Sequence, residues 1–327
     1  MKIGVYGGTF NPPHLGHLTA ARAVFELLRL DKLLLIPARL PPHKELPEGS
    51  PAPEQRLELT RLAGEQLNLG DKVETLDIEL RREGKSYTSD TLAEVRDRYP
   101  GAELWLLMGT DMFLTIQAWH EPESIFAQAG IAAFGRTEED TEELFAIQRH
   151  HLYQHYPDIR IFTLTIPGVI DISSTELREQ LAKGEGGRLL APAVYGYILK
   201  NRLYGTDADL KHLTLEQLRP IALSYLKHQR IPHVLGTEQE AIRLAERYGA
   251  DVRKARVAAL LHDCTKRLEM DEQLALCRHY GIELDELERH ALKLLHAKTG
   301  APSPGMCSGW TMRSTPPFTG IPPDTPA

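Results

Sequence analysis

The sequence predicts an α/β domain built on a parallel sheet, followed by a domain made only of helices. Over residues 1–204, short β-branched or leucine-rich runs alternate with amphipathic stretches, which is typical of a parallel sheet with helices on both faces. From Thr214 onward the strand-like runs stop and helical patterns follow one another. The length of 327 residues also favours two domains, at about 150 residues each.

Strands are expected where the runs are short and apolar. They fall at residues 2–6, 32–36, 73–78, 103–108, 131–134 and 160–163. Helical periodicity predicts helices at residues 15–28, 54–67, 89–98, 139–150, 173–181 and 193–200. In the second domain it predicts helices at residues 215–228, 234–248, 252–261, 270–280 and 284–295, with Pro232 and Gly249 as breaks. Ligands of such sheets bind beyond the carboxyl ends of strands, so chemistry is expected in the loops that follow them.

A polar stretch at residues 205–210 separates the strand–helix alternation from the purely helical pattern. We therefore expect one domain at residues 1–204 and a helical domain at residues 205–300. Residues 301–327 hold seven prolines and only two charged residues, Arg313 and Asp324. That composition excludes helices and is typical of a disordered tail.

The composition excludes several classes of protein. With 42% hydrophobic and 25% charged residues the chain is globular, and no apolar run is long enough to span a membrane. A net charge of −7 argues against a sequence-independent nucleic-acid binder, so a phosphate site is expected to be local. Three cysteines are too few for a disulfide framework, and the amino end does not resemble a signal peptide, so we expect a cytoplasmic protein. The sequence leaves open whether the chain forms homo-oligomers.

The sharpest motif, GGTFNPPHLGH at residues 7–17, directly follows the first expected strand. Gly7 and Gly8 allow a tight turn that brings backbone N–H groups close to an anion. The proline pair places a helix start near His14, so the positive end of that helix faces the same pocket. His14 and His17 then lie on one face of the first turn, where both imidazoles can reach one phosphate. Two surface histidines beside an ordinary turn are the alternative interpretation.

This motif resembles the signature of the nucleotidyltransferase superfamily that carries a His-x-x-His motif, and most closely its bacterial nicotinate-nucleotide adenylyltransferases. Four further segments resemble that family in order. They are PPHK at 41–44, SYTSDTL at 86–92, GTDMF at 109–113 with Trp119 downstream, and ISSTELR at 172–178. Together the five motifs extend over residues 1–204 and imply a Rossmann-like sheet.

The resemblance implies that a mononucleotide phosphate attacks the α-phosphorus of ATP and releases pyrophosphate, a reaction that needs alignment and charge neutralisation. It implies small-molecule substrates, ATP and nicotinate mononucleotide, with Mg²⁺ bridging the triphosphate. His14, His17 and Arg178 are the expected catalytic residues. The expected ATP and phosphate contacts are Gly7, Gly8, Thr9, Phe10, Lys44, Gly109, Asp111, Ser173 and Ser174. Thr88 and Trp119 would hold the nicotinate ring.

Several of these residues also have plain structural interpretations. Arg178 alone reads as a solvated helix residue, and Ser173 with Glu176 reads as a capping box, which is compatible with phosphate binding at the same helix end. Trp119 could be core. His120 stands where the family often has tyrosine, beside the expected ring contacts.

The helical domain resembles the HD metal-dependent phosphohydrolases, and within them a bacterial subgroup that hydrolyses diadenosine tetraphosphate. RIPH at 230–233 and LHDCTK at 261–266 carry the resemblance, and the ligands it implies are His233, His262, Asp263 and His296. Neutral imidazoles with one carboxylate suit Fe or Mn, which would polarise phosphate and generate hydroxide.

That family has a further histidine and a late aspartate after His296, which this chain lacks. We hypothesise a frameshift near Ala301, since a shifted reading of residues 320–324 can give His-Thr-Thr-Gly, which resembles the missing motif. Sequencing the gene tests this. As given, the second domain is expected to have weak or no hydrolase activity.

Three other functions remain open at this point. The HD hydrolase could be the main or a second activity, which metal content and diadenosine tetraphosphate cleavage would show. A nucleotide sensor is a second alternative, against which the intact His14, His17 and Arg178 argue. A third is another adenylyl- or cytidylyltransferase of the superfamily, such as one acting on a pantetheine phosphate, against which the Ser-Tyr-Thr segment and Trp119 argue.

Overall fold

A computed structural model describes residues 1–40, 46–135, 139, 141–166, 173–209, 212–291, 295–296 and 298–299. Within them the chain divides into two compact units. The first comprises Met1–Val194 and Leu203–Gly205, and the second comprises Tyr195–Arg202 and the described residues from Thr206 onward. None of the described helices is both long enough and apolar enough to cross a membrane.

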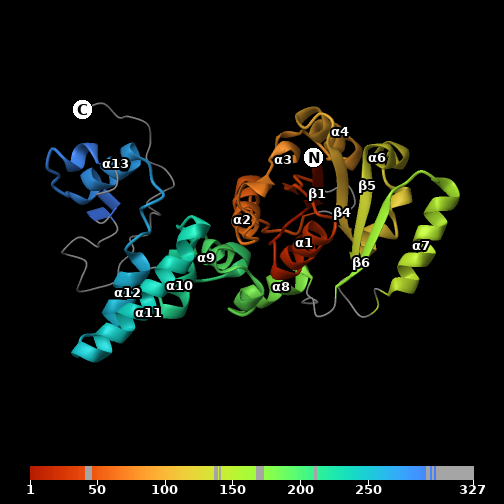
Figure 1. Cartoon of the computed structure of the whole chain (residues 1–327). Helices are drawn as coiled ribbons and strands as arrows, with labels where there is room; N and C mark the ends of the chain where they lie inside the picture. The colour runs from red at the N-terminus through yellow and green to blue at the C-terminus, as the bar shows by residue number, and fades with distance from the viewer. Residues whose placement is uncertain are drawn as a thin grey trace. The chain divides into compact units, whose positions relative to one another are not determined.

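The first unit contains a six-stranded sheet in which all neighbouring strands pair in parallel (Figure 1). The strands are β1 (Lys2–Gly8), β2 (Lys32–Pro37), β3 (Val73–Thr75), β4 (Glu103–Gly109), β5 (Ala129–Gly135) and β6 (Ile161–Thr165). Their order is β3-β2-β1-β4-β5-β6. The order reverses between β1 and β4, and such a reversal is where open α/β sheets bind ligands, beyond the carboxyl ends of the strands. The expected parallel α/β architecture is confirmed.

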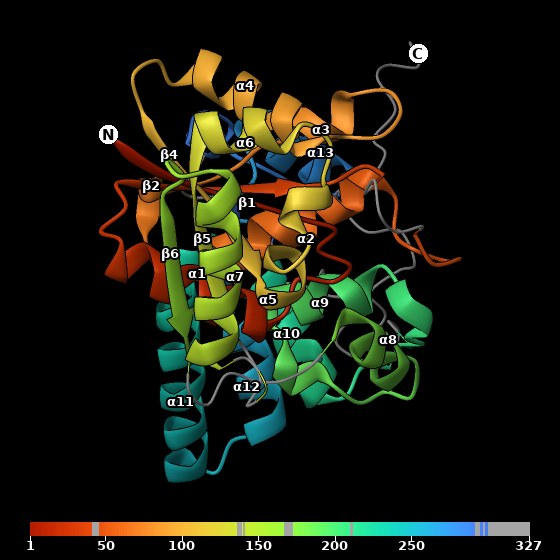
Figure 2. The ribbon, with the colours of Figure 1, turned by 90° about the vertical axis from the view of Figure 1, so that its right-hand side faces the viewer.

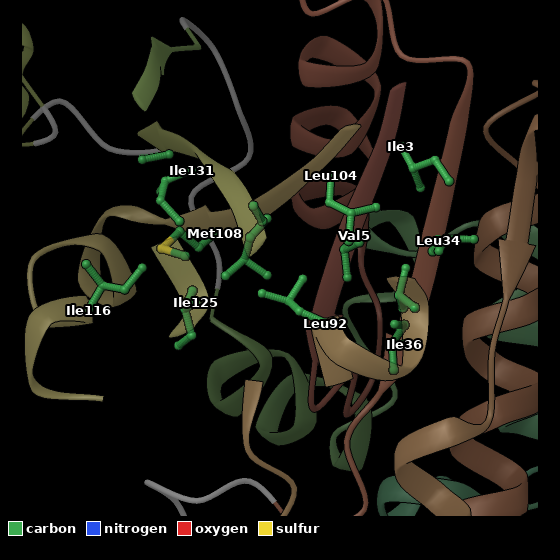
Figure 3. Packing of buried hydrophobic residues seen from close by; sticks show 14 of the residues in the cluster. Ile3, Val5, Leu34, Ile36, Leu92, Leu104, Met108, Ile116, Ile125 and Ile131 are labelled. Carbon is green, nitrogen blue, oxygen red and sulfur yellow. The ribbon is translucent and has the colours of Figure 1, made fainter. Parts of the chain in front are cut away.

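One face of the sheet is covered by a continuous apolar core (Figure 3). Alternate residues of the strands, such as Ile3 and Val5, point to this face because successive side chains of a strand alternate. Leu92 of α4 (Thr88–Arg98) and Ile125 of α6 (Pro122–Gln128) pack against them, and α7 (Glu142–His155) lies along β6 (Figure 2). Helix α2 (Pro53–Glu65) packs on the opposite face, where Gly64 approaches Leu35.

Helices α1 to α7 of this unit lie between successive strands, and α8 follows β6. They are α1 (Leu15–Leu27), α2 (Pro53–Glu65), α3 (Ile78–Arg81), α4 (Thr88–Arg98), α5 (Thr110–Phe113), α6 (Pro122–Gln128), α7 (Glu142–His155) and α8 (Ser174–Ala182). The strand expected at 73–78 ends at Thr75, because α3 begins at Ile78. The short helices α3, α5 and α6 were not expected, since one or two turns leave no clear periodicity.

The second unit is helical, with α10 (Leu215–Ser224), α11 (Ile231–Tyr248), α12 (Val252–Leu261) and α13 (Met270–Tyr280). Leu218, Val234 and Leu260 contribute to a core between α10, α11 and α12. The end of α9 (Pro192–Lys200) also belongs to this unit. There Gly196 lies so close to the Pro220 carbonyl that a Cβ would stand 1.8 Å from its oxygen.

The expectation of a helix at 284–295 is wrong over its described part up to residue 291. There the structure has only a 3-10 turn, Glu288–His290. Asp285 and Glu288 cap each other's backbone N–H groups, but this box starts a single turn, and the Glu288 carboxylate also pairs with Lys298. The sequence pattern of a helix start is therefore present without a helix that continues.

Candidate active site and candidate metal centre

The turn after β1 is shaped by glycine and by a strained aromatic residue. The Phe10 ring lies directly over Gly8, where a Cβ would stand 3.1 Å from the nearest ring atom. Phe10 itself is buried and has a positive φ of 44°, a conformation that costs a bulky residue about 1–3 kcal/mol. Gly7 has open space beside it. Residues 7–10 therefore present backbone rather than side chains at the end of β1.

The two histidines of the motif lie together at the start of α1. His14 is the residue before the first turn, and its backbone N–H donates to Nδ1 of His17 at 3.2 Å. The two rings have centroids 3.7 Å apart, and the Phe10 ring packs against His17 at 5.5 Å. His14 is buried and His17 is half-buried. Both imidazoles thus stand at the positive end of a helix, next to the glycine turn.

Helix α8 is tied to the same turn. Arg178 donates to the carbonyl of Asn11 at 2.8 Å, and the Ser174 hydroxyl donates to the carbonyl of Pro12 at 3.3 Å. Ser173 caps α8 by accepting from the N–H of Glu176, while the Glu176 carboxylate accepts from Ser173 in return. The expected capping box is present, and the same helix end brings Arg178 beside the His14 loop.

The loops after β3 and β4 form a second group at the same edge of the sheet. Gly109 ends β4, and exposed Asp111 lies in the short helix that follows. Thr88 is the first residue of α4, and the ring of Tyr87 before it stacks with His120 at a centroid distance of 4.1 Å. Half-buried Trp119 packs against the sheet core. The structure therefore brings the Ser-Tyr-Thr segment next to the Trp119 loop.

Three polar residues support the first loop, and two of them, Arg56 and Tyr204, were not expected from the sequence. Asn11 is buried and donates from Nδ2 to the Ser50 hydroxyl at 2.8 Å. Arg56 is wholly buried behind Thr9, and the Tyr204 hydroxyl is buried near Arg56 and Arg178, whose charges act on it. Asn11 belongs to the motif, whereas Arg56 lies in an ordinary-looking helical pattern and Tyr204 lies between an expected helix and the polar stretch at 205–210. Lys44 lies outside the described residues.

Close to the Ser-Tyr-Thr segment, Glu79 is a carboxyl group in an apolar setting. Burial raises its pKa to about 7, and the hydrogen bond of 2.7 Å from the Thr91 hydroxyl only partly offsets this. The Arg82 guanidinium also donates to Thr91 and pairs with Glu94. Glu79 therefore holds α3 against α4 at the base of the loop that carries Tyr87 and Thr88.

In the second unit, three histidines and one aspartate converge. Nε2 of His233 lies 3.2 Å from Nε2 of His262, and Asp263 Oδ2 lies 3.8 and 3.6 Å from these atoms. Nε2 of His296 lies 3.6 Å from Asp263 Oδ1. The Thr265 hydroxyl donates to the His296 carbonyl and holds that residue in place. The four residues expected to bind metal are thus brought together.

The donor set fits a divalent transition metal. Two nitrogen ligands at about 2.1 Å from one ion lie about 3 Å apart. The Nε2 atoms of His233 and His262 have this separation. His262 Nδ1 contacts the Ala259 carbonyl at 2.7 Å, which leaves Nε2 as the lone-pair nitrogen. Burial and the nearby Arg230 lower the pKa of His233, which favours the neutral ligand form. Asp263, although burial opposes it, has its pKa lowered by Arg230 and His262 and is ionised.

The hypothesis of a lost histidine motif concerns residues 301–327. These residues lie outside the described part of the chain, as does the proposed frameshift near Ala301. Both remain predictions.

The sheet and the paired histidines define a nucleotidyltransferase, and comparison with known proteins agrees. Residues 5–180 match the cytidylyltransferase-like family model, and residues 230–302 match the HD domain model. The chain belongs to the nicotinate-nucleotide adenylyltransferase family, extended by an HD domain. A relative from Shewanella baltica (strain OS185), "Probable nicotinate-nucleotide adenylyltransferase", is 39% identical over 220 residues, which are 62% of this chain and 99% of the relative. One of the same name from Exiguobacterium sibiricum is 34% identical, over 63% of this chain and 100% of the relative.

Solved structures support the fold. The Plasmodium falciparum nicotinic acid mononucleotide adenylyltransferase complexed with NaAD has a TM-score of 0.52 at 20% identity, over 63% of this chain and 98% of that chain. The same enzyme complexed with APC has a TM-score of 0.50 at 19% identity, with the same coverage.

Proposed function

We propose that the first unit joins the AMP moiety of ATP to nicotinate mononucleotide, giving deamido-NAD and pyrophosphate. One observation carries this proposal: two imidazoles with centroids 3.7 Å apart lie at the start of α1, beside a bare glycine turn and Arg178. Such a cluster of donors and positive charge suits a polyphosphate in a chain whose net charge is negative.

In the proposed reaction, an ionised phosphate oxygen of the mononucleotide attacks the α-phosphorus of ATP. A new bond forms between that oxygen and phosphorus, the bond from phosphorus to the bridging oxygen breaks, and the electron pair leaves with pyrophosphate. The nucleophile is already deprotonated, so the protein needs no general base. His14, His17, Arg178 and the N–H groups of residues 8–10 would hold the triphosphate in line and neutralise the charge that develops.

Mg²⁺ enters this scheme as part of the substrate, MgATP. The described residues of the turn offer imidazole nitrogens and backbone N–H groups, whereas Mg²⁺ prefers oxygen ligands, so phosphate oxygens are its natural partners. Asp111 is exposed after β4 and is the carboxylate among the expected contacts that could approach the ion.

The mononucleotide would bind at the loops after β3 and β4. Thr88 stands at the N-terminus of α4, where backbone N–H groups favour a carboxylate, and Trp119 offers an aromatic face. The Tyr87–His120 stack links the two loops, so His120 replaces tyrosine without separating them.

Pyrophosphate release from ATP tests the proposal, with nicotinate and nicotinamide mononucleotide compared as second substrates. We expect release with both to be saturable and kcat/KM to be higher with nicotinate mononucleotide. Equal kcat/KM values for the two mononucleotides would contradict the substrate assignment. No pyrophosphate release with either would contradict the proposed reaction.

We propose a second function for the HD unit, the binding of Fe or Mn by His233, His262, Asp263 and His296. The converging donor set carries this proposal. A bound ion would polarise phosphate and supply hydroxide, while Arg230 and Lys266, which both contact Asp263, would hold the carboxylate in place. Metal analysis and diadenosine tetraphosphate cleavage test it. We expect metal with weak hydrolysis, and a metal-free protein would remove the assignment.

A further inference from the structure

Arg56 of α2 is an arginine with no exposed surface, which is unusual for so large a cation. Its guanidinium donates to the carbonyls of Thr9, Ala38 and Arg39, the first and last at 3.2 and 3.1 Å. These carbonyls belong to two loops, which leave the adjacent strands β1 and β2 at the carboxyl edge of the sheet. One side chain therefore connects the turn after β1, at Thr9, to the loop after β2, at Ala38 and Arg39.

The charge of Arg56 is not neutralised by an ion pair with any carboxylate in the described part of the chain. Glu54 acts on it only as a nearby charge, and burial lowers its pKa, but a guanidinium keeps its proton in proteins. The positive charge is balanced by the negative ends of peptide dipoles. Burying a cation is costly in free energy unless it is hydrogen-bonded, and here the three backbone carbonyls provide those bonds.

The bond to Thr9 has a directional consequence. In a planar trans peptide, the C=O of Thr9 and the N–H of Phe10 point in opposite directions. Because Arg56 donates to the Thr9 carbonyl, the Phe10 N–H points away from Arg56. The guanidinium charge polarises this peptide group through its carbonyl. Phe10 also holds a left-handed conformation that needs outside support to persist.

We propose that Arg56 is a positioning residue for adenylyl transfer, which holds the Thr9–Phe10 peptide so that the Phe10 N–H faces the triphosphate. This inference rests on the proposed function. Its bonds to Ala38 and Arg39 fix the neighbouring loop relative to that peptide, so both loops are aligned by the same guanidinium.

The test compares Arg56→Lys and Arg56→Ala with matched changes of Arg61, which lies on the same helix but pairs with Glu58 and Glu65. The folded fraction is measured by circular dichroism and the rates are expressed per folded molecule. We expect kcat to fall about 100-fold in Arg56→Ala, the size seen when one charge-stabilising donor is lost, and less in Arg56→Lys. The Arg61 variants should keep the wild-type kcat.

Chemical rescue separates positioning from folding. Added guanidinium ion should raise kcat of Arg56→Ala severalfold at concentrations where equal sodium chloride does not, and it should not affect Arg61→Ala. Kinetic constants per folded molecule within twofold of wild type would overturn the proposal. So would a loss of activity that follows the unfolded fraction alone and that guanidinium does not restore.

A second readout does not depend on the reaction. Calorimetric binding of a nonhydrolysable ATP analogue should weaken in Arg56→Ala and stay unchanged in Arg61→Ala. A wild-type protein that binds the analogue but releases no pyrophosphate would contradict the proposed function, while analogue affinity unchanged in Arg56→Ala would contradict the role of Arg56.

Discussion

The guanidinium of Arg178 donates a 2.8 Å hydrogen bond to the backbone carbonyl of Asn11, a residue 167 positions earlier in the chain. This bond places the one charged side chain of the Ile-Ser-Ser-Thr motif that could bind phosphate against the loop that carries His14. Because Arg178 uses only part of its donor fork here, the remaining N–H groups can serve a ligand.

Replacing Arg178 by Ala should lower kcat/KM for ATP about 100-fold, since both a charge and a loop contact are lost. Arg178→Lys should recover only part of this, because an ammonium cannot reproduce the fork. Steady-state pyrophosphate release measures the change. Exposed Arg188 provides the control, and an equal loss in Arg188→Ala would show that general surface charge is responsible.

His17 has two roles that a pair of variants can separate. Its Nδ1 accepts the backbone N–H of His14, a capping bond that Asn can also accept, whereas only an imidazole supplies the second nitrogen. We expect His17→Ala and His17→Asn both to lower kcat about 1,000-fold, with His17→Asn melting near the wild-type temperature. Full activity in His17→Asn would mean that His17 acts through the cap alone.

Trp119 should affect one substrate and not the other. Trp119→Leu removes the aromatic face but keeps an apolar side chain against the core, so KM for the mononucleotide should rise about tenfold. KM for ATP serves as the internal control and should stay unchanged. A parallel rise of both constants would indicate a distorted sheet edge instead of a lost ring contact.

The pH dependence of stability should report Glu79. Its pKa is raised from 4.5 to about 7, so the folded protein favours the protonated form, and this contribution to stability is complete below pH 4.5 and lost as the pH rises through 7. Glu79→Gln removes the loss. The variant should therefore gain about 2–3 kcal/mol of unfolding free energy relative to wild type between pH 5 and pH 8.5, an order-of-magnitude figure.

Denaturant unfolding at the two pH values measures this gain. Glu94→Gln is the matched control, since Glu94 is the exposed carboxylate of the same cluster. If both variants respond to pH alike, the effect belongs to the surface pair with Arg82 and not to the buried carboxyl.

The metal centre should depend on His262 and Asp263 and not on histidines elsewhere in the unit. His262→Ala and Asp263→Asn should lower bound Fe or Mn severalfold, as measured by plasma mass spectrometry, because each removes one ligand. His279 is exposed on α13, and His279→Ala should retain the metal. Chelation should leave pyrophosphate release intact once Mg²⁺ is restored.

The sequence predicted the parallel sheet and the converging motifs because both are local patterns. Strand–helix alternation determines the sheet, and motifs that follow strands are brought to one edge by it, as His14 and Arg178 show. The burial of the Arg56 side chain could not be predicted from the sequence. An arginine on an amphipathic helix is expected to be solvated, and only tertiary packing determines that this one is enclosed. The helix expected at 284–295 is absent from its described part up to residue 291 for a similar reason, since Asp285 starts a turn that packing does not extend.

The close contact of Gly196 with Pro220 has a consequence for separating the two units of this chain. This chain covers 99% of the Shewanella baltica relative with 62% of its own length, and α9 passes from the first unit to the second at Tyr195. Because Gly196 lies against the backbone of Pro220, this surface of α9 packs on α10. Truncation after α9 would leave that surface exposed. Excising the transferase unit from this chain therefore requires redesigning that helix, because part of α9 packs within the helical unit.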